Sequence, residues 1–189
     1  MVQVLPPAKL AHVVLRSNNY EPMIEFYVKF LGARISQKGP VAAFLTYDEE
    51  HHRIAIINMP HLSPRVGSSN GLEHVAFTYN TLGDLVTAYK QRLELGIKPV
   101  WTVNHGATMS FYYQDPDGNK LEQQVNTMTP EEADEFMRTE EFTVNPLGVD
   151  VDPEELISRL EAGEDEKTLL KRPDEGPREL STLPLAMIN

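Results

Sequence analysis

Three side chains in this sequence have the types and positions that a metal site requires. His12 lies in the run Ala11–Leu15, and His74 lies in a similar run, Glu73–Phe77, about 60 residues later. Glu122 lies in a further strand-like run. Two imidazoles and one carboxylate on one face, with open positions opposite, suit oxygen chemistry at non-heme Fe(II), and Mn(II) fits the same donors. The sequence therefore predicts a metal site made of His12, His74 and Glu122.

A single histidine in a strand is more often a packing or surface residue than a ligand, so the argument for a metal depends on the repeat. The two histidines take equivalent places in two copies of one segment, residues 9–60 and 71–126. Each copy has the pattern of a strand, an amphipathic helix and three further strands. A duplication that gives each copy one histidine predicts a shared site on a pseudo-twofold axis. The residue pattern alone leaves both a metal site and ordinary packing open.

Periodicity and chain breakers place the elements that must position these residues. Helices are expected over residues 20–31 and 81–95, where apolar residues recur at helical spacing and a glycine follows. The expected strands are residues 10–16, 33–37, 41–47, 53–59, 72–79, 97–102, 108–114 and 120–125. The pattern is that of an α+β protein built from two tandem βαβββ modules.

The last strands of the two copies differ at one informative position. Aligning residues 52–56 with residues 119–123 places Ala55 where the second copy has Glu122. The fourth ligand that the repeat would supply by symmetry is therefore absent. Coordination on that side would be left open for substrate and dioxygen.

Three further residues are candidates for chemistry because of their positions relative to Glu122 and Ala55. His52 opens the strand that carries Ala55. His105 lies between two strands that lead towards Glu122, and Tyr112 lies one strand before that residue. Ordinary surface or core placement is the alternative for each of them.

Composition excludes several classes of protein. The net charge of −11 argues against a nucleic-acid partner, because phosphate binding needs clustered lysine and arginine. The chain has no cysteine, so disulfide bonds and thiolate metal sites are excluded. No apolar run is long enough to span a membrane, and the start of the chain does not have the pattern of a signal peptide. These features predict a soluble cytoplasmic protein that uses neither nucleic acid nor a membrane.

The composition changes to acidic and proline-punctuated from residue 127 onward. Thr129–Glu132 and Asp152–Glu155 each have a capping residue, a proline and a glutamate at helix-start spacing, so two short helices are expected, the second ending near Gly163. We expect residues 9–126 to form one domain. Residues 127–189 would be a partly helical C-terminal extension that packs on the core or on a partner subunit.

These residues together resemble the vicinal oxygen chelate superfamily, which contains the glyoxalases, the bleomycin resistance proteins and the extradiol dioxygenases. Within it, the chain is most similar in pattern to ring-cleaving dioxygenases of the biphenyl-2,3-diol and catechol 2,3-dioxygenase type. The segments that carry the resemblance are Leu10–Leu15, His51–Ile56, Gly71–Phe77, His105–Gly106 and Ser110–Glu122. The resemblance implies that the two modules form a metal-cupping eight-stranded sheet.

The resemblance also implies a role for each candidate residue. The iron ligands of the family would correspond to His12, His74 and Glu122. His52 would correspond to the histidine that stabilises bound oxygen and acts as an acid and base. His105 and Tyr112 would correspond to the pair that hydrogen-bonds the substrate hydroxyls.

The function that follows is Fe(II)-dependent extradiol cleavage of a catechol or a polycyclic aromatic diol, with dioxygen inserted beside the vicinal hydroxyls. Two alternatives stay open because fold alone does not fix the reaction. One is a metal-dependent isomerase or lyase of the same fold, and the other is an aromatic-ligand binding protein without catalysis. The resemblance further implies a homodimer or a higher homo-oligomer.

Overall fold

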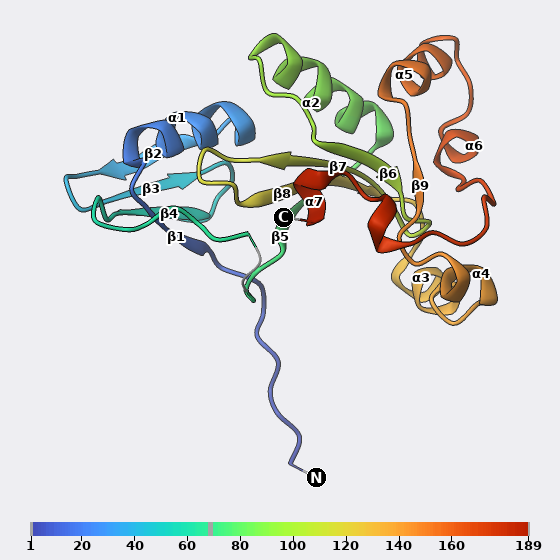
Figure 1. Cartoon of the computed structure of the whole chain (residues 1–189), viewed down its shortest axis with the longest axis horizontal. Helices are drawn as coiled ribbons and strands as arrows, with labels where there is room; N and C mark the ends of the chain where they lie inside the picture. The colour runs from blue at the N-terminus through green and yellow to red at the C-terminus, as the bar shows by residue number, and fades with distance from the viewer. Residues whose placement is uncertain (1, 68–69, 189) are drawn as a thin grey trace. The chain divides into compact units, whose positions relative to one another are not determined.

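The computed structural model describes residues 2–67 and 70–188 and contains two compact units (Figure 1). The first unit ends at Arg65, and the second begins at Val66. Each unit contains one sheet: the eight expected strands fall four to each sheet, and an additional strand joins the second sheet, which therefore has five. Across the described residues, no helix is both long and apolar enough to cross a membrane.

The first unit is a four-stranded sheet with one helix packed on it. Its elements are β1 (Val13–Ser17), α1 (Tyr20–Leu31), β2 (Arg34–Lys38), β3 (Ala42–Thr46) and β4 (Ile54–Asn58), and the strand order is β1-β4-β3-β2. The helix ends where Gly32 adopts a φ of 63°, as the sequence predicts. Met23 and Phe30 of α1 are completely buried, as are Ala43, Leu45 and Ile56 of the sheet. The unit therefore has an apolar core of its own.

The second unit repeats this order and adds a strand. Its elements are β5 (His74–Tyr79), α2 (Leu82–Glu94), β6 (Trp101–Asn104), β7 (Thr108–Gln114), β8 (Lys120–Asn126) and β9 (Val149–Asp150), in the order β5-β8-β7-β6-β9. The two-residue β9 comes from the C-terminal extension and pairs with β6. Figure 1 shows α2 lying over this sheet.

Two of the predicted strands begin at least three residues later than expected. The strand expected over residues 97–102 begins at Trp101 and runs to Asn104. Pro99 has no N–H to give to a ladder, and Val100 donates to the Tyr112 carbonyl just before regular pairing starts. The first strand begins at Val13, so His12 lies just before β1 and not inside it.

The registers of the two sheets confirm the alignment of the repeats. In the first unit β1 runs parallel to β4 with Val14 opposite Ala55, two residues after His12. In the second unit β5 runs parallel to β8 with Ala76 opposite Glu122, two residues after His74. Ala55 and Glu122 therefore occupy equivalent positions of equivalent strands.

The neighbouring strands extend the same equivalence. On β3, Phe44 lies opposite Ala55, and on β7, Tyr112 lies opposite Glu122. An apolar pair in one sheet thus takes the place of a polar pair in the other.

The extension after residue 127 consists of short elements: α3 (Pro130–Phe136), α4 (Glu140–Val144), α5 (Pro153–Glu161), α6 (Glu166–Leu170), the 3-10 helix η1 (Leu180–Thr182) and α7 (Leu185–Ile188). The two predicted helix starts are confirmed, because Thr129 and Glu132 form a capping box and Asp152 caps α5. The sequence did not predict α4, β9, α6, η1 or α7.

The extension belongs to the second unit by its contacts. Leu156, Ile157 and Leu169 are buried. Tyr89 of α2 donates a hydrogen bond to Glu154 at 2.9 Å, and Glu166 accepts from the backbone N–H groups at the start of α2. In Figure 1 its helices gather at the β6 and β9 side of the sheet, whereas α7 returns towards β5.

Candidate active site

The centre of the candidate site in the second unit is a histidine–carboxylate pair on two neighbouring parallel strands. His74 begins β5 and Glu122 lies on β8, and Nε2 of His74 is 2.9 Å from Oε2 of Glu122. The Glu122 residue is only 4% exposed. An unpartnered carboxylate at such a position would be strongly destabilising, so its hydrogen bonds must offset the cost of burial.

The two groups titrate as an ion pair. The hydrogen bond to Glu122 is the main cause that raises the pKa of His74 to about 9, against the opposing effect of its burial. Burial would by itself raise the pKa of Glu122, but hydrogen bonds from His74 and Ser110 hold it below its usual value. Near neutral pH the His74 ring is therefore protonated and the Glu122 carboxylate is ionised.

The donor atoms of this pair fit two ligands of one metal ion. Two atoms that are each about 2.1 Å from an ion, at a right angle, lie about 3 Å apart, close to the separation seen here. A metal would replace the proton that His74 Nε2 now shares with Glu122. Among the residues that the structure describes, no three histidine, aspartate or glutamate side chains gather as ligands. The structure thus brings together two of the three predicted ligands, and His12 belongs to the first unit.

Tyr112 and His105 lie against the same carboxylate. Tyr112 sits directly opposite Glu122 in the β7–β8 ladder, and its hydroxyl is 3.0 Å from Nε2 of His105. Burial and the neighbouring Glu122 raise the pKa of Tyr112 well above its ordinary value, so the phenol stays protonated. Burial lowers the pKa of His105, so its ring is neutral near pH 7. The pair therefore offers one phenol and one uncharged imidazole beside the His74–Glu122 donors.

An aromatic wall supports this pair. The ring of Trp101 stacks on Tyr112 with centroids 5.1 Å apart and meets the His105 ring edge-on at 5.5 Å. The indole N–H donates to Asp150 at 2.7 Å, and the Arg178 guanidinium lies 5.4 Å from the ring centroid. Contacts on both sides of the indole therefore restrict its movement.

The loop that carries His105 is held from behind by the extension. Gly106 has a φ of 97°, and a Cβ at this position would lie 2.4 Å from the Phe136 ring, so only glycine fits. Asn104 accepts from the Gly106 N–H and donates to the Leu170 carbonyl at 2.9 Å. The buried Arg172 donates to the His105 carbonyl at 3.2 Å.

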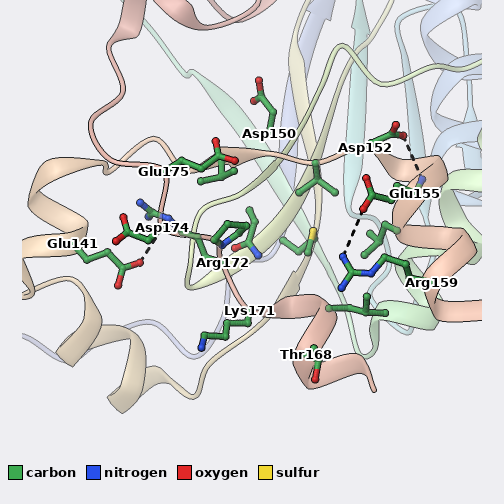
Figure 2. A pocket seen from close by; sticks show the side chains of 17 residues that line it. Glu141, Asp150, Asp152, Glu155, Arg159, Thr168, Lys171, Arg172, Asp174 and Glu175 are labelled. Carbon is green, nitrogen blue, oxygen red and sulfur yellow. Dashed lines mark hydrogen bonds and ion pairs between the residues drawn. The ribbon is translucent and has the colours of Figure 1, made fainter. Parts of the chain in front are cut away.

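A cavity of about 720 Å³ lies behind this loop, among β9, α5, α6 and residues 171–175 (Figure 2). Asn104 and Arg172 contribute to its wall, and Figure 2 shows Arg172 beside Glu141, with which it forms an ion pair at 3.9 Å. The remainder of the lining mixes acidic and apolar side chains with the two cations Arg159 and Lys171. The cavity therefore adjoins residues that hold the His105 loop.

The candidate residues of the first unit form a separate histidine cluster. The rings of His12 and His52 lie 4.3 Å apart, and Phe44 meets the His52 ring edge-on at 5.1 Å. His51 is a third ring of this cluster, 4.3 Å from His52. Burial, followed by the positive potential of its two histidine neighbours, lowers the pKa of His52. His52 is therefore uncharged at neutral pH and lies next to the predicted ligand His12.

Sequence reasoning identified His74, Glu122, Tyr112 and His105 but missed the residues that hold them. Asn104 and Arg172 meet around the His105 loop although they are far apart in the chain. A local signal existed only for Gly106, which stands between the loop histidine and the next strand. Arg172 contacts residues that are distant in the sequence, so no periodic pattern indicates its role.

Comparison with known proteins places the chain in a superfamily. Residues 9–123 match the model of the Glyoxalase/Bleomycin resistance protein/Dioxygenase superfamily, and the chain belongs to it. Solved structures agree in fold. A lactoylglutathione lyase from Agrobacterium tumefaciens has a TM-score of 0.52 at 16% identity and covers 64% of this chain and 96% of its own. A glyoxylase/bleomycin resistance protein/dioxygenase domain from Frankia sp. EAN1pec has a TM-score of 0.54, also at 16% identity, and covers 64% and 99%.

Curated relatives are closer in sequence. Biphenyl-2,3-diol 1,2-dioxygenase 3 of Rhodococcus globerulus is 43% identical over 87% of this chain and 88% of the relative. Biphenyl-2,3-diol 1,2-dioxygenase 2 of the same organism is also 43% identical, over 82% and 83%. The predicted superfamily and fold class are thereby confirmed.

Proposed function

We propose that this protein is an Fe(II)-dependent extradiol dioxygenase that cleaves the ring of a catechol or a polycyclic aromatic diol. The observation that carries the proposal is the convergence of His74 and Glu122 donor atoms 2.9 Å apart, with the Tyr112 hydroxyl against the same carboxylate. The identity of 43% to two biphenyl-2,3-diol dioxygenases supports a ring-cleaving oxidoreductase. His12, His74 and Glu122 are the proposed metal ligands.

The metal fits the donor set, because two imidazoles and a carboxylate with open positions suit Fe(II). When bound, it would chelate the diol, lower the pKa of its hydroxyls and activate dioxygen. The residues of the chain then have distinct tasks. Glu122 and His74 fix the position of the ion, so their burial and mutual orientation determine where the diol oxygens lie.

Tyr112 and His105 are proposed to orient the diol. Burial and Glu122 raise the pKa of Tyr112, so the phenol keeps its proton. Its O–H can therefore donate a hydrogen bond to a diol oxygen that has become negative. The neutral His105 ring donates its one N–H to the backbone of Leu147, so its other nitrogen can accept a hydrogen bond from the second hydroxyl of the diol. Trp101, stacked on Tyr112, gives this part of the site an aromatic surface that suits a flat ring.

His52 is proposed to move the proton. Its lowered pKa keeps the imidazole uncharged at neutral pH, so it could hold a proton taken from a diol hydroxyl and return it later in the reaction. Its contact with His12 supports a place near the metal. Three further features stay predictions: Mn(II) in place of iron, a homodimer or higher homo-oligomer, and a cytoplasmic location.

A metal-dependent isomerase or lyase is the second candidate, because the fold is shared with a lactoylglutathione lyase. The notable difference is Ala55, which stands where the repeat would otherwise supply a second carboxylate. We expect a glyoxalase-type enzyme to use a carboxylate from both modules, so Ala55 favours the dioxygenase. An aromatic-ligand binding protein would need neither metal nor buried Glu122.

The test is anaerobic loading with Fe(II), then addition of 2,3-dihydroxybiphenyl, 3-methylcatechol or a naphthalenediol under air. Oxygen uptake and the yellow absorbance of the ring-fission product are followed together, with Mn(II)-loaded protein in parallel. Stoichiometric uptake with yellow product is the expected result. Diol binding without oxygen uptake would favour the isomerase or lyase, and failure to retain any metal would contradict the proposed site.

A further inference from the structure

His74 is held at both ring nitrogens. Nε2 faces Glu122, while Nδ1 hydrogen-bonds the side chain of its chain neighbour Glu73. A metal-ligating histidine commonly donates its second ring N–H to a carboxylate, which fixes the orientation of the ring. Glu73 therefore stands where an orienting carboxylate would be needed.

Glu73 needs a partner to stay in this position. Its side chain is 52% exposed, so water competes for the carboxylate and many rotamers are open to it. Lys120, directly opposite His74 in the β5–β8 ladder, places its ammonium 2.9 Å from Glu73. The Lys120 side chain is only 8% exposed, which is unusual for lysine unless its charge is paired.

The second partner of Lys120 comes from the end of the chain. Its ammonium donates to the Met187 carbonyl of α7 at 2.7 Å. The side chains of Leu183 and Met187 pack against the cluster of Trp101, Val103 and Tyr112. The last helix therefore contacts the aromatic wall and, through Lys120 and Glu73, reaches the ring of His74.

The first unit supplies an independent parallel. Arg53 stands two residues before Ala55, as Lys120 stands two residues before Glu122. Its guanidinium donates to the carbonyls of Leu10 and Ala11, at 2.7 and 3.0 Å, immediately before His12. Both repeats thus place a cation at the same position to hold the segment next to the histidine.

We propose that Lys120 is a positioning residue that couples the docking of the C-terminal helix α7 to the orientation of His74 through Glu73. The inference rests on the proposed function, in which His74 is a metal ligand. Loss of Lys120 releases Glu73 to solvent, frees the His74 ring to rotate, and detaches the Met187 carbonyl. Metal retention should therefore depend on residues that never touch the metal.

The experiment compares Lys120→Met, Lys120→Arg, Glu73→Ala and a chain ending at Pro184 with the unaltered protein. Lys90→Met is the matched control, since Lys90 makes an ion pair with Glu161 on the surface of the same unit. Each protein is loaded with Fe(II) without oxygen, and iron transfer to a coloured chelator is followed. Thermal melting shows whether each variant is folded.

Lys120→Met, Glu73→Ala and the shortened chain should lose iron about 10- to 100-fold more readily, the usual effect of removing an outer-shell partner. Lys120→Arg should recover most of the retention, and Lys90→Met should match the unaltered protein. Iron retention unchanged in folded Lys120→Met and Glu73→Ala would overturn the inference and make Lys120 a structural cation only.

A metal-free measurement separates this inference from the proposed function. In the NMR spectrum of the apoprotein, the Nδ1 proton of His74 should be protected from exchange and should vanish in Lys120→Met and Glu73→Ala. If the unaltered protein retained no iron, the proposed function would fail, and this proton would still decide whether Lys120 orients His74. A proton unaffected by both variants would overturn the inference.

Discussion

The two sheets have the same strand order and equivalent registers, yet one carries polar chemistry at positions where the other is apolar. Glu122 and Tyr112 face each other across β8 and β7, whereas Ala55 and Phe44 face each other across β4 and β3. Both Glu122 and Ala55 are almost completely buried, at 4% and 3% exposure. The backbone therefore accepts either chemistry, and the side chains alone decide which sheet can hold an ion.

The two positions also differ in the free-energy cost of burying their side chains. A buried carboxylate is expensive unless hydrogen bonds and a counter-charge compensate, whereas a buried alanine costs nothing. The second sheet surrounds Glu122 with His74, Ser110 and Tyr112, and the first sheet has no such requirement. Retention of Glu122 in the costly position is what the proposed metal site would explain.

Replacing the carboxylate should have the largest effect on this contrast. Glu122→Gln makes the second sheet neutral like the first, so it should abolish iron retention and reduce ring cleavage by at least about 10³-fold. Metal content per chain and oxygen uptake measure the two effects. Retained iron with normal turnover would remove Glu122 from the ligand set.

The histidine cluster of the first sheet provides the next test. His52→Phe keeps the ring contact with Phe44 but removes the proposed acid and base, so turnover should fall by about 10²- to 10⁴-fold while iron and anaerobic diol binding persist. Stopped-flow mixing of the iron–diol complex with oxygen isolates this step. His51→Phe is the control from the same cluster, and equal losses in both variants would indicate only a packing defect.

The reverse substitution asks whether the first sheet can accept the charge. Ala55→Glu places a carboxylate opposite Phe44, where Glu122 has the Tyr112 hydroxyl, so it should lower the free energy of unfolding by about 3 kcal/mol or more. Urea denaturation with Ala55→Leu as a size control measures it. A stability equal to that of Ala55→Leu would show that the first sheet tolerates a buried carboxylate better than its side chains indicate.

Tyr112→Phe makes the second sheet resemble the first at one hydroxyl. Loss of a hydrogen bond to a charged oxygen should lower kcat/KM for the diol by about 10- to 100-fold. Iron retention should be unchanged, because the ring still stacks on Trp101. The matched change Phe44→Tyr in the other sheet should leave kcat/KM within about twofold. A comparable loss in both variants would contradict the assigned role of Tyr112.

The smallest effect concerns the aromatic wall of the second sheet, in which Trp101 stacks on Tyr112. Burial opposes the ionisation of Asp150, but hydrogen bonds from Arg178 and Trp101 hold its pKa below the usual value. Such a carboxyl stabilises the fold above its unfolded pKa, and this contribution is lost as pH falls through the lower, folded pKa. Because Asp150 is largely solvent-accessible, the effect should be at most about 1 kcal/mol.

Trp101 is the single tryptophan of the chain, so its fluorescence reports this contact directly. Acidification below about pH 4 should change the emission as Asp150 takes up a proton. Asp150→Asn should abolish that change, whereas Asp152→Asn, beside it in the chain, should not. Identical acid transitions in both variants would assign the change to another group.

Features that depend on neighbouring residues in the sequence were predicted correctly. The repeated strand–helix–strand pattern, the glycine after α1 and the capping residues Thr129 and Asp152 act within a few neighbours, and all are found as expected. The alignment of Ala55 with Glu122 also came from local pattern, and the register of both sheets confirms it.

Contacts between distant segments were beyond such reasoning. Nothing near Arg172 in the sequence indicates that it holds the His105 carbonyl, or that Asp150 receives the Trp101 indole. Asp165 caps the start of helix α6, but the five residues of this helix are too few to show periodicity. The roles assigned to the six candidate residues also remain predictions, since they depend on a bound metal and substrate.

The fit of Gly106 against the Phe136 ring has a consequence for the order in which the protein is made. The ribosome delivers residue 106 well before residue 136, and Arg172 comes later still. Domains fold progressively as the chain emerges, at about 5–20 residues per second. The His105 loop thus leaves the ribosome without the ring and guanidinium that hold it, and gains both contacts only after residue 172 has been made. A chain released after residue 150 but before residue 172 contains all strands of both sheets but lacks the Arg172 hydrogen bond to the His105 carbonyl. His105 is therefore the part of the candidate site whose support is completed last.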